Sequence, residues 1–165
     1  MLKSKDMPSP TKADRLSVED AARRAVGRIY GCCPERRNVR VGNAGAVHEF
    51  DIYAENVVIG GVSTSTLKTS GQNRNTGGTD RACHELLWLS LWSGCESRIH
   101  VLTDMPLAQW LYGRFNGVAF CHEISIYHYD AASDVLRKIG SLASHGEVQS
   151  AHCPPPCATN PGRTG

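Results

Sequence analysis

The sequence has no long hydrophobic run and almost no net charge. None of its apolar segments approaches the roughly 18 residues that cross a bilayer, and residues 1–15 lack the apolar segment of a secretory signal peptide. With 165 residues and a formal net charge of +2, overall charge alone does not indicate a nucleic-acid-binding protein. We therefore expect one cytoplasmic domain that makes no membrane contact.

Cysteine is plentiful but forms no recognisable disulfide or metal pattern. The seven cysteines are an odd number, and the expected cytoplasmic setting keeps thiols reduced. Structural zinc needs four well-spaced ligands. Cys32 and Cys33 are adjacent, and His152, Cys153 and Cys157 lie in a Pro-rich end whose composition predicts disorder. The spacing therefore argues against zinc.

Composition divides the chain into a central part and two ends. Residues 1–16 contain charges, two prolines and no periodicity, which predicts a flexible lead. Residues 143–165 are rich in Gly, Pro, Ser and Thr, which predicts a disordered tail. Helical and strand patterns fill residues 17–142, so we expect a single domain there.

Helices and strands alternate within this domain. Ser17 and Asp20 have the spacing of a capping box, and the helix that follows ends near Gly31. Strands are expected within 38–47 and at 48–53, 57–65, 98–104 and 120–129, the second and third forming a hairpin. Further helices are expected from residue 79 or 80 to about 93, from 106 to 117, and weakly over 133–142. After a polar first turn, the helix at 79–93 is apolar nearly all round, which predicts burial along its length with only its N-terminus reaching solvent.

The element order α-β-β-β-α-β-α-β indicates an α/β fold. Strands joined by a hairpin run antiparallel, whereas strands joined through a helix run parallel by a right-handed crossover. The sequence therefore predicts a mixed central sheet flanked by helices.

The order of helix, three strands, helix and strand over residues 17–104 resembles the core of the PD-(D/E)XK superfamily, the restriction-endonuclease-like fold. In that family an aspartate on the second strand and an (E/D)-x-K motif on the third bind a divalent metal. Asp51 matches the aspartate, but Gly61 stands where the acid is expected and Ser63 where the lysine is expected. The resemblance therefore implies a Mg²⁺-dependent DNA nuclease with an altered motif.

Strand geometry offers a way to complete the altered motif. In a regular strand Glu49, Asp51 and Tyr53 share one face. If Tyr53 pairs with Val57, then Asp51 lies opposite Ile59 and Glu49 lies opposite Gly61, where it fills the space of the missing acid. Two carboxylates on one patch, Glu49 and Asp51, are what Mg²⁺ requires of a protein.

Two residues outside these strands are further catalytic candidates. Lys68, in the following loop, is placed to replace the lysine missing at Ser63, and Glu85 is an additional carboxylate. Both also have ordinary interpretations, Lys68 as a loop residue and Glu85 as the i,i+4 partner of Arg81.

The loop of residues 70–79 has the composition of a phosphate-binding segment. Gly77 and Gly78 permit close approach of the backbone, and the next helix offers free N–H groups to an anion. The donors available for phosphates or base edges are Asn73, Arg74, Asn75 and Arg81. No Gly-Lys-Ser/Thr follows, so the loop is not a Walker A motif. Its alternative interpretation is a flexible connection with a good N-cap.

Three functions stay open on the sequence alone. The first is a metal-dependent nuclease, and the second is a non-catalytic relative of that fold that binds nucleic acid or a protein. The third is an α/β module that binds another phosphorylated ligand. Clustered arginines at 23, 24 and 28 and at 36, 37 and 40 suit a nucleic-acid partner, whereas nothing in the sequence indicates a homodimer.

Overall fold

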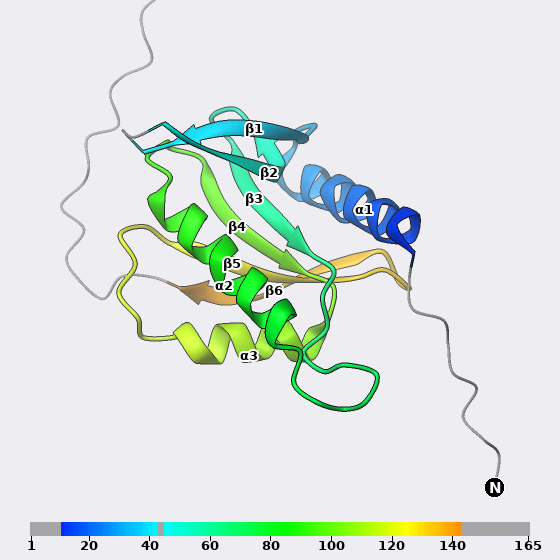
Figure 1. The fold of residues 1–165 in the computed structure, drawn as a ribbon. Helices are drawn as coiled ribbons and strands as arrows, with labels where there is room; N and C mark the ends of the chain where they lie inside the picture. Colours follow the sequence, from blue (N-terminus) through cyan, green and yellow to red (C-terminus); the bar gives the residue numbers. More distant parts are fainter. Residues whose placement is uncertain (1–10, 43–44, 143–165) are drawn as a thin grey trace, which may run out of the picture.

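A six-stranded mixed sheet with helices on both faces forms the body of the protein (Figure 1). The computed structural model describes residues 11–42 and 45–142. Its helices are α1 (Lys12–Tyr30), α2 (Thr76–Leu91) and α3 (Met105–Phe115). Its strands are β1 (Glu35–Val41), β2 (Ala46–Ala54), β3 (Val58–Ser63), β4 (Ser97–Leu102), β5 (Ile124–Asp130) and β6 (Val135–Leu142). The predicted α/β class with a mixed sheet is confirmed, and the predicted tail at 143–165 lies outside the described residues.

The sheet follows the order of the chain, β1-β2-β3-β4-β5-β6. Strands β1, β2 and β3 form an antiparallel meander, β4 and β5 run parallel to β3, and β6 returns antiparallel to β5. The two helical crossovers, through α2 and α3, produce the parallel part. No helix within the described ranges is long and apolar enough to cross a membrane.

Helix α1 begins at Lys12, inside the predicted flexible lead. Thr11 caps it, because its hydroxyl accepts from the Asp14 N–H and the Asp14 carboxylate accepts from the Thr11 N–H at 2.9 Å. The prediction that Ser17 starts the helix is therefore wrong, since an equivalent capping box lies earlier in the chain. The predicted end is confirmed: Gly31 adopts a left-handed φ of 66° as C-cap.

The weak helix predicted over 133–142 is instead strand β6. A turn after β5 reverses the chain, and in it the Asp130 carboxylate accepts from the Ala132 N–H and the Ser133 hydroxyl. Asp134 then adopts a φ of 52°, which ends any helical path. The weak helical pattern is overridden because pairing with β5 satisfies the backbone groups of both strands.

Strands β2 and β3 pair in a register two residues away from the predicted one. Tyr53 faces Ile59, not Val57, because Asn56 takes a left-handed φ of 60° and the Val57 N–H donates to the Ala54 carbonyl. A bulge also interrupts the pairing of β1 with β2, since Arg37 faces Phe50 while Glu35 faces Tyr53. The predicted regular alternation through residues 49, 51 and 53 is therefore broken.

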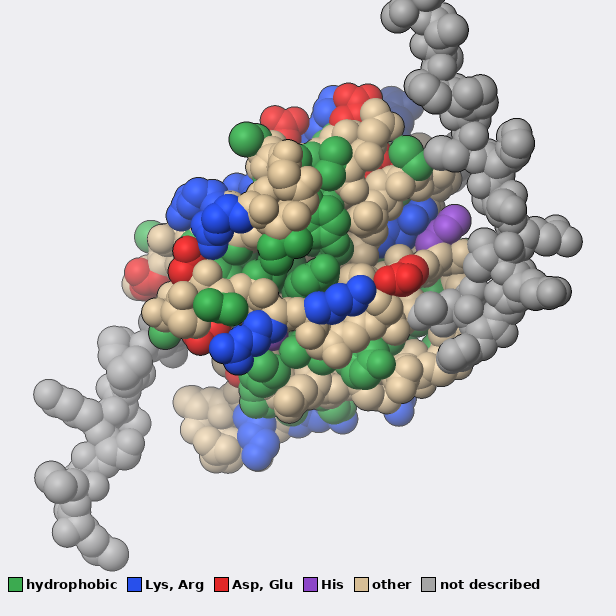
Figure 2. All heavy atoms as spheres, turned by 180° about the vertical axis from the view of Figure 1, so that it is seen from behind, with side chains coloured by type: hydrophobic (Ala, Val, Ile, Leu, Met, Phe, Trp, Pro, Cys, Tyr) green, Lys and Arg blue, Asp and Glu red, His purple; other side chains and the backbone are tan. Residues whose placement is uncertain are grey.

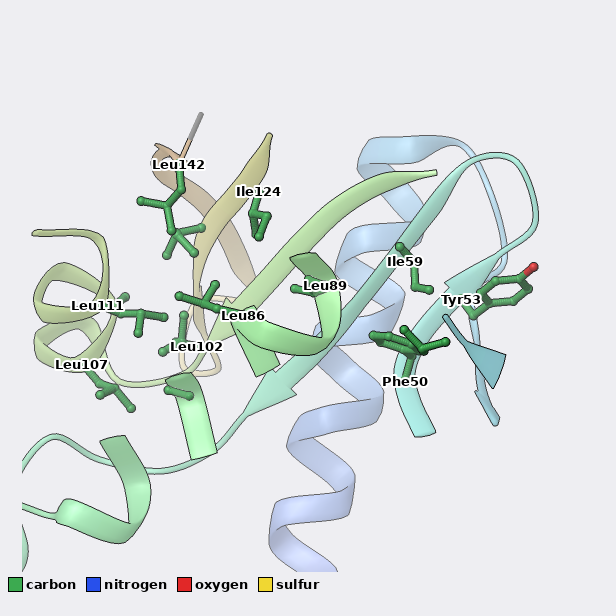
Figure 3. Close-up of a cluster of buried hydrophobic side chains, with 14 residues drawn as sticks. Phe50, Tyr53, Ile59, Leu86, Leu89, Leu102, Leu107, Leu111, Ile124 and Leu142 are labelled. Atoms are coloured by element: carbon green, nitrogen blue, oxygen red, sulfur yellow. The ribbon is translucent and has the colours of Figure 1, made fainter. Parts of the chain in front are cut away.

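Each face of the sheet carries its own apolar core. Ala22, Ala25 and Val26 of α1 pack with Ile52 and Val58 on one face. Helices α2 and α3 cover the other face (Figure 3). The labelled side chains there are Phe50, Tyr53, Ile59, Leu86, Leu89, Leu102, Leu107, Leu111, Ile124 and Leu142. The cores fix the ends of α1 and α2 relative to the sheet, which positions the groups described below.

The prediction that α2 is buried along its length, with only its N-terminus reaching solvent, is wrong. The apolar side chains of α2 that are buried against the sheet are Ala82, Leu86 and Leu89. In contrast, Leu87 is 52% exposed and Leu91 is 51% exposed. A helix lying on a sheet buries one stripe of side chains, so the remaining apolar residues of α2 face outward.

Candidate functional site

A pocket of about 400 Å³ lies at the carboxyl end of β3. Residues 62–65, at and just after the end of β3, line it together with Lys12, Arg15, Leu16 and Glu19 of α1, Arg81 and Glu85 of α2, and His100 of β4. We call it the β3 pocket. In open α/β sheets, ligands bind outside the carboxyl ends of the parallel strands, and this pocket has that location.

Three cations stand around the β3 pocket. Lys12 and Arg15 come from the first turns of α1, and Arg81 comes from the second turn of α2. All three side chains are exposed, and none forms an ion pair with another residue of the described ranges. Ser63 and Ser65 also line the pocket, and its three cations outnumber its two carboxylates, Glu19 and Glu85. The pocket therefore offers both positive charge and hydroxyl groups to an anion.

Glu85 occupies the space that a side chain at residue 61 would need. A Cβ built on Gly61 would overlap the Glu85 carboxyl group and lie 2.7 Å from its Cγ. The Oε2 atom of Glu85 contacts His48 Nε2 at 3.1 Å, and the His48 ring stacks on Trp88 with 4.7 Å between centroids. Glu49 was predicted to fill this space, and the two-residue change of register explains why it does not.

His100 lies beside Gly61 on β4 and is 1% exposed. Burial lowers the pKa of its imidazole to about 3, so the ring is neutral at physiological pH. Its Nδ1 atom and the Oε1 atom of Glu85 are both buried without a hydrogen-bond partner in the described parts of the chain. Unsatisfied polar atoms at the floor of a pocket point to a ligand or water that completes them.

The predicted metal-binding carboxylates, Glu49 and Asp51, lie in a cluster around Arg36 of β1 that shares Glu19 with the β3 pocket. Asp51 Oδ1 lies 3.3 Å from Arg36 Nε, and Asp51 Oδ2 accepts from the Val62 N–H at 3.0 Å. The same guanidinium contacts Glu49 at 3.8 Å and Glu19 at 2.8 Å. Burial raises the pKa of Glu19, the negative charge of Asp51 raises it further, and Arg36 opposes both effects. One cation thus holds three carboxylates together.

This arrangement does not fit the Mg²⁺ site expected from the sequence. Both oxygens of Asp51 already have partners, and Glu49 is 52% exposed beside the Arg36 guanidinium. No group of three or more His, Cys, Asp or Glu side chains within 11–42 and 45–142 is arranged to hold a metal ion. A cation already occupies the position at which these carboxylates would bind a metal.

The chain matches no protein-family model, no curated protein and no solved structure. Function is therefore inferred from the geometry of the chain itself.

The polar loop before α2 is folded back on itself. Lys68 and Arg74 form a β-bridge, and the Thr69 N–H donates to the Asn73 carbonyl at 2.8 Å. The Arg74 guanidinium lies over the Trp110 ring, 4.6 Å from its centroid. Lys68 and Arg74 line a separate pocket of about 200 Å³ with Trp110. Lys68 therefore does not line the β3 pocket, where the sequence placed it as a substitute lysine.

The other predicted phosphate ligands have structural roles or remain exposed. Asn75, rather than Thr79 or Asp80, caps α2: its Oδ1 accepts from the Gly78 N–H, and its Nδ2 donates to the Thr66 carbonyl. Gly78 is buried, and a Cβ there would come within 2.9 Å of Ser65 Cβ. Asn73 and Gly77 are exposed. Of this predicted set, only Arg81 lines the β3 pocket.

Four residues of this region were not recognised from the sequence: Lys12, Arg15, His48 and His100. The first two were assigned to a flexible lead, although the spacing of Thr11 and Asp14 is a capping signal that could have revealed the helix. No sequence signal pairs His48 with Glu85, because that contact depends on how α2 lies across β2.

Proposed function

We propose that this protein is a non-catalytic nucleic-acid-binding module with a restriction-endonuclease-like core, and that the β3 pocket receives a backbone phosphate. The element order supports the proposed core: a helix, an antiparallel meander of three strands, and a second helix leading to β4, which pairs parallel with β3. Helices α1 and α2 pack on opposite faces of this sheet.

The observation that carries the binding function is the set of unpaired cations around the β3 pocket. Some arginines elsewhere are neutralised within the fold, as Arg28 is by Asp134 at 2.9 Å and Arg36 by Glu19. Lys12, Arg15 and Arg81 have no such partners among the described residues. Phosphates attract such cations at long range and release bound counterions on contact.

The fixed carboxylates support the non-catalytic part of this proposal. Hydrolysis in the family that this chain resembles needs acids free to bind a metal and a lysine beside them. Here Arg36 and the Val62 N–H hold Asp51, and Ser63 provides no cation. The cations of the pocket suit phosphate contact instead, because such contacts position a nucleic acid without requiring any chemical step.

A metal-dependent nuclease is the second candidate, and one observation favours it. The carboxylate of Glu85 lies in the space of the missing acid at Gly61, so a negative charge is present at that position although it comes from a helix. Its Oε2 atom is engaged by His48. Cleavage that disappears in an Asp51→Ala variant would support this candidate over the binding module.

The binding function is tested by fluorescence anisotropy with a labelled DNA oligonucleotide over a range of salt concentrations. An Arg15→Gln/Arg81→Gln variant removes two cations of the β3 pocket. We expect weaker binding and a decrease of about 1 in the salt slope for each phosphate that the variant no longer neutralises. The matched control is Arg24→Gln/Arg114→Gln, which removes the same charge from exposed positions outside the pocket. Equal weakening in the two variants would contradict the proposed site.

On the face seen in Figure 2, the charge distribution is consistent with a local site rather than a basic surface. Figure 2 shows the molecule from behind, where Lys and Arg side chains are spread among acidic and apolar ones and form no continuous patch. If binding depends on a few cations in one pocket, the affinity should depend only weakly on salt concentration. The slope should be smaller than that of proteins with an extended basic face.

A further inference from the structure

Another pocket, of about 420 Å³, lies at the opposite end of the parallel strands. Ser97 and Arg98 line it where β4 begins, and Ser125 lines it near the start of β5. The end of α1 contributes Tyr30, and β6 contributes Lys138. We call it the β4 pocket, and it shares no lining residue with the β3 pocket.

Arg98 is a buried cation without a direct ion pair to a carboxylate of the described residues. It is 8% exposed, yet no ion pair joins it to a carboxylate within 11–42 and 45–142. Its guanidinium donates to the carbonyl oxygens of Trp92 at 2.8 Å, Gly94 at 2.9 Å and Glu96 at 3.4 Å. Its Nε has no partner among the described residues. A buried charge of this kind is costly unless an anion compensates it.

The two carboxylates that line the β4 pocket are already engaged. Glu96 accepts from the Asn56 N–H at 3.1 Å and from the Trp92 indole N–H at 2.8 Å. Glu123 accepts from the Ser141 hydroxyl at 2.6 Å and pairs with Lys138 at 3.5 Å. Neither makes a direct ion pair with the Arg98 guanidinium, although the negative charge of Glu96 opposes the lowering of the Arg98 pKa that burial causes.

Neutral donors complete the lining. The hydroxyls of Tyr30 and Tyr127 lie 3.4 Å apart, and burial raises the pKa of Tyr30, so the group is a protonated donor at neutral pH. Burial and the positive charge of Arg98 both lower the pKa of His122, which also lines the pocket. A guanidinium with hydroxyl donors around it is the donor set that an oxyanion requires.

From this geometry we infer that the β4 pocket binds a small oxyanion, a phosphate or a carboxylate, on the guanidinium of Arg98 and the hydroxyls of Tyr30 and Tyr127. The site is independent of the proposed nucleic-acid function, because it lies at the other end of the strands. A pocket of this size accommodates a metabolite-sized ligand.

The test titrates inorganic phosphate, and separately acetate, into the ¹³C,¹⁵N-labelled full chain at constant ionic strength, with the His122 side-chain resonances as local reporter. Saturable shifts with phosphate alone identify a phosphate site, and shifts with both anions identify a general oxyanion site. Absence of any saturable shift with either anion would overturn the inference.

Variants tie the response to the proposed donors. Arg98→Lys keeps the charge but removes the planar fork, and we expect about tenfold weaker binding. Tyr30→Phe removes one hydroxyl from a half-buried position and should weaken binding about threefold, which keeps the inference testable if Arg98→Lys does not fold. Arg81→Gln in the β3 pocket is the control and should leave the His122 response unchanged. Wild-type affinity in both Arg98→Lys and Tyr30→Phe would contradict the assignment.

Discussion

The carboxyl group of Glu85, on α2, lies in the space beside Gly61 of β3 that a side chain at residue 61 would otherwise fill. Any side chain at Gly61 would displace Glu85 from its contact with His48. The acid at this position therefore comes from α2 rather than from β3, which separates it from the Asp51 cluster around Arg36.

Gly61→Ala is expected to destabilise the protein by about 1–3 kcal/mol, because the new methyl group overlaps the Glu85 carboxyl group. The measurement is urea unfolding. The control is Gly113→Ala in α3, where a Cβ meets nothing within 4 Å and where alanine should add about 0.5–1 kcal/mol of stability. The destabilisation should shrink in a Glu85→Ala background, and an equal destabilisation in both backgrounds would contradict the shared space.

Arg36→Gln should leave three neighbouring carboxylates without their common cation. We expect about 1 kcal/mol of destabilisation at pH 7, since the groups are partly exposed. Glu19 already has a raised pKa, so its ionisation costs stability as the pH rises through that pKa, and removal of Arg36 increases this cost. The difference from wild type should therefore shrink when unfolding is repeated near pH 4. Arg40→Gln, an exposed change on the same strand, is the control.

His100 should make the fold sensitive to acid. Its folded pKa of about 3 lies below the ordinary histidine value of 6.5, so the unfolded chain binds a proton between these values that the folded chain does not. This contribution to stability is complete above pH 6.5 and is lost as the pH falls toward 3, with a slope of up to about 1.4 kcal/mol per pH unit. His100→Leu removes this titrating group, so the free energy of unfolding of the variant should fall less steeply between pH 6 and pH 4 than that of wild type. Parallel plots of unfolding free energy against pH for the two proteins would contradict this role of His100.

Helix α1 is capped by Thr11, whereas the sequence predicted a cap at Ser17, so variants of these two residues test where the helix begins. Thr11→Ala removes the capping hydroxyl and should cost about 0.5–2 kcal/mol. Ser17 is exposed inside the helix, so Ser17→Ala should be neutral or slightly stabilising. Thermal unfolding of both variants gives the measurement: Thr11→Ala should have the lower melting temperature. A lower melting temperature for Ser17→Ala would instead place the cap at Ser17.

The fold was largely predictable because its elements have strong local signals. The helix end at Gly31, the hairpin and the apolar strand β4 follow from patterns within single segments. Strand β6 was not predictable in this way, because its pairing with β5 depends on a turn at residues 130–134 that overrides a weak helical pattern.

The candidate site was less predictable because it depends on register and on contacts between distant elements. The bulge in β2 and the turn at Asn56 decide which residues face Gly61, and neither leaves a clear mark in the hydrophobic pattern. Glu85 was recognised as a candidate, but its position against Gly61 follows only from how α2 crosses β3.

The central claim is that the β3 pocket binds nucleic acid without cleaving it, and one experiment tests this most directly. Labelled DNA is incubated with wild-type protein and with Asp51→Ala, each with Mg²⁺, with Mn²⁺ and with a chelator, and both binding and strand length are recorded. The proposal predicts binding to intact DNA by wild type under all three conditions, and no cleavage by either protein. Metal-dependent cleavage by wild type that disappears in Asp51→Ala would contradict it.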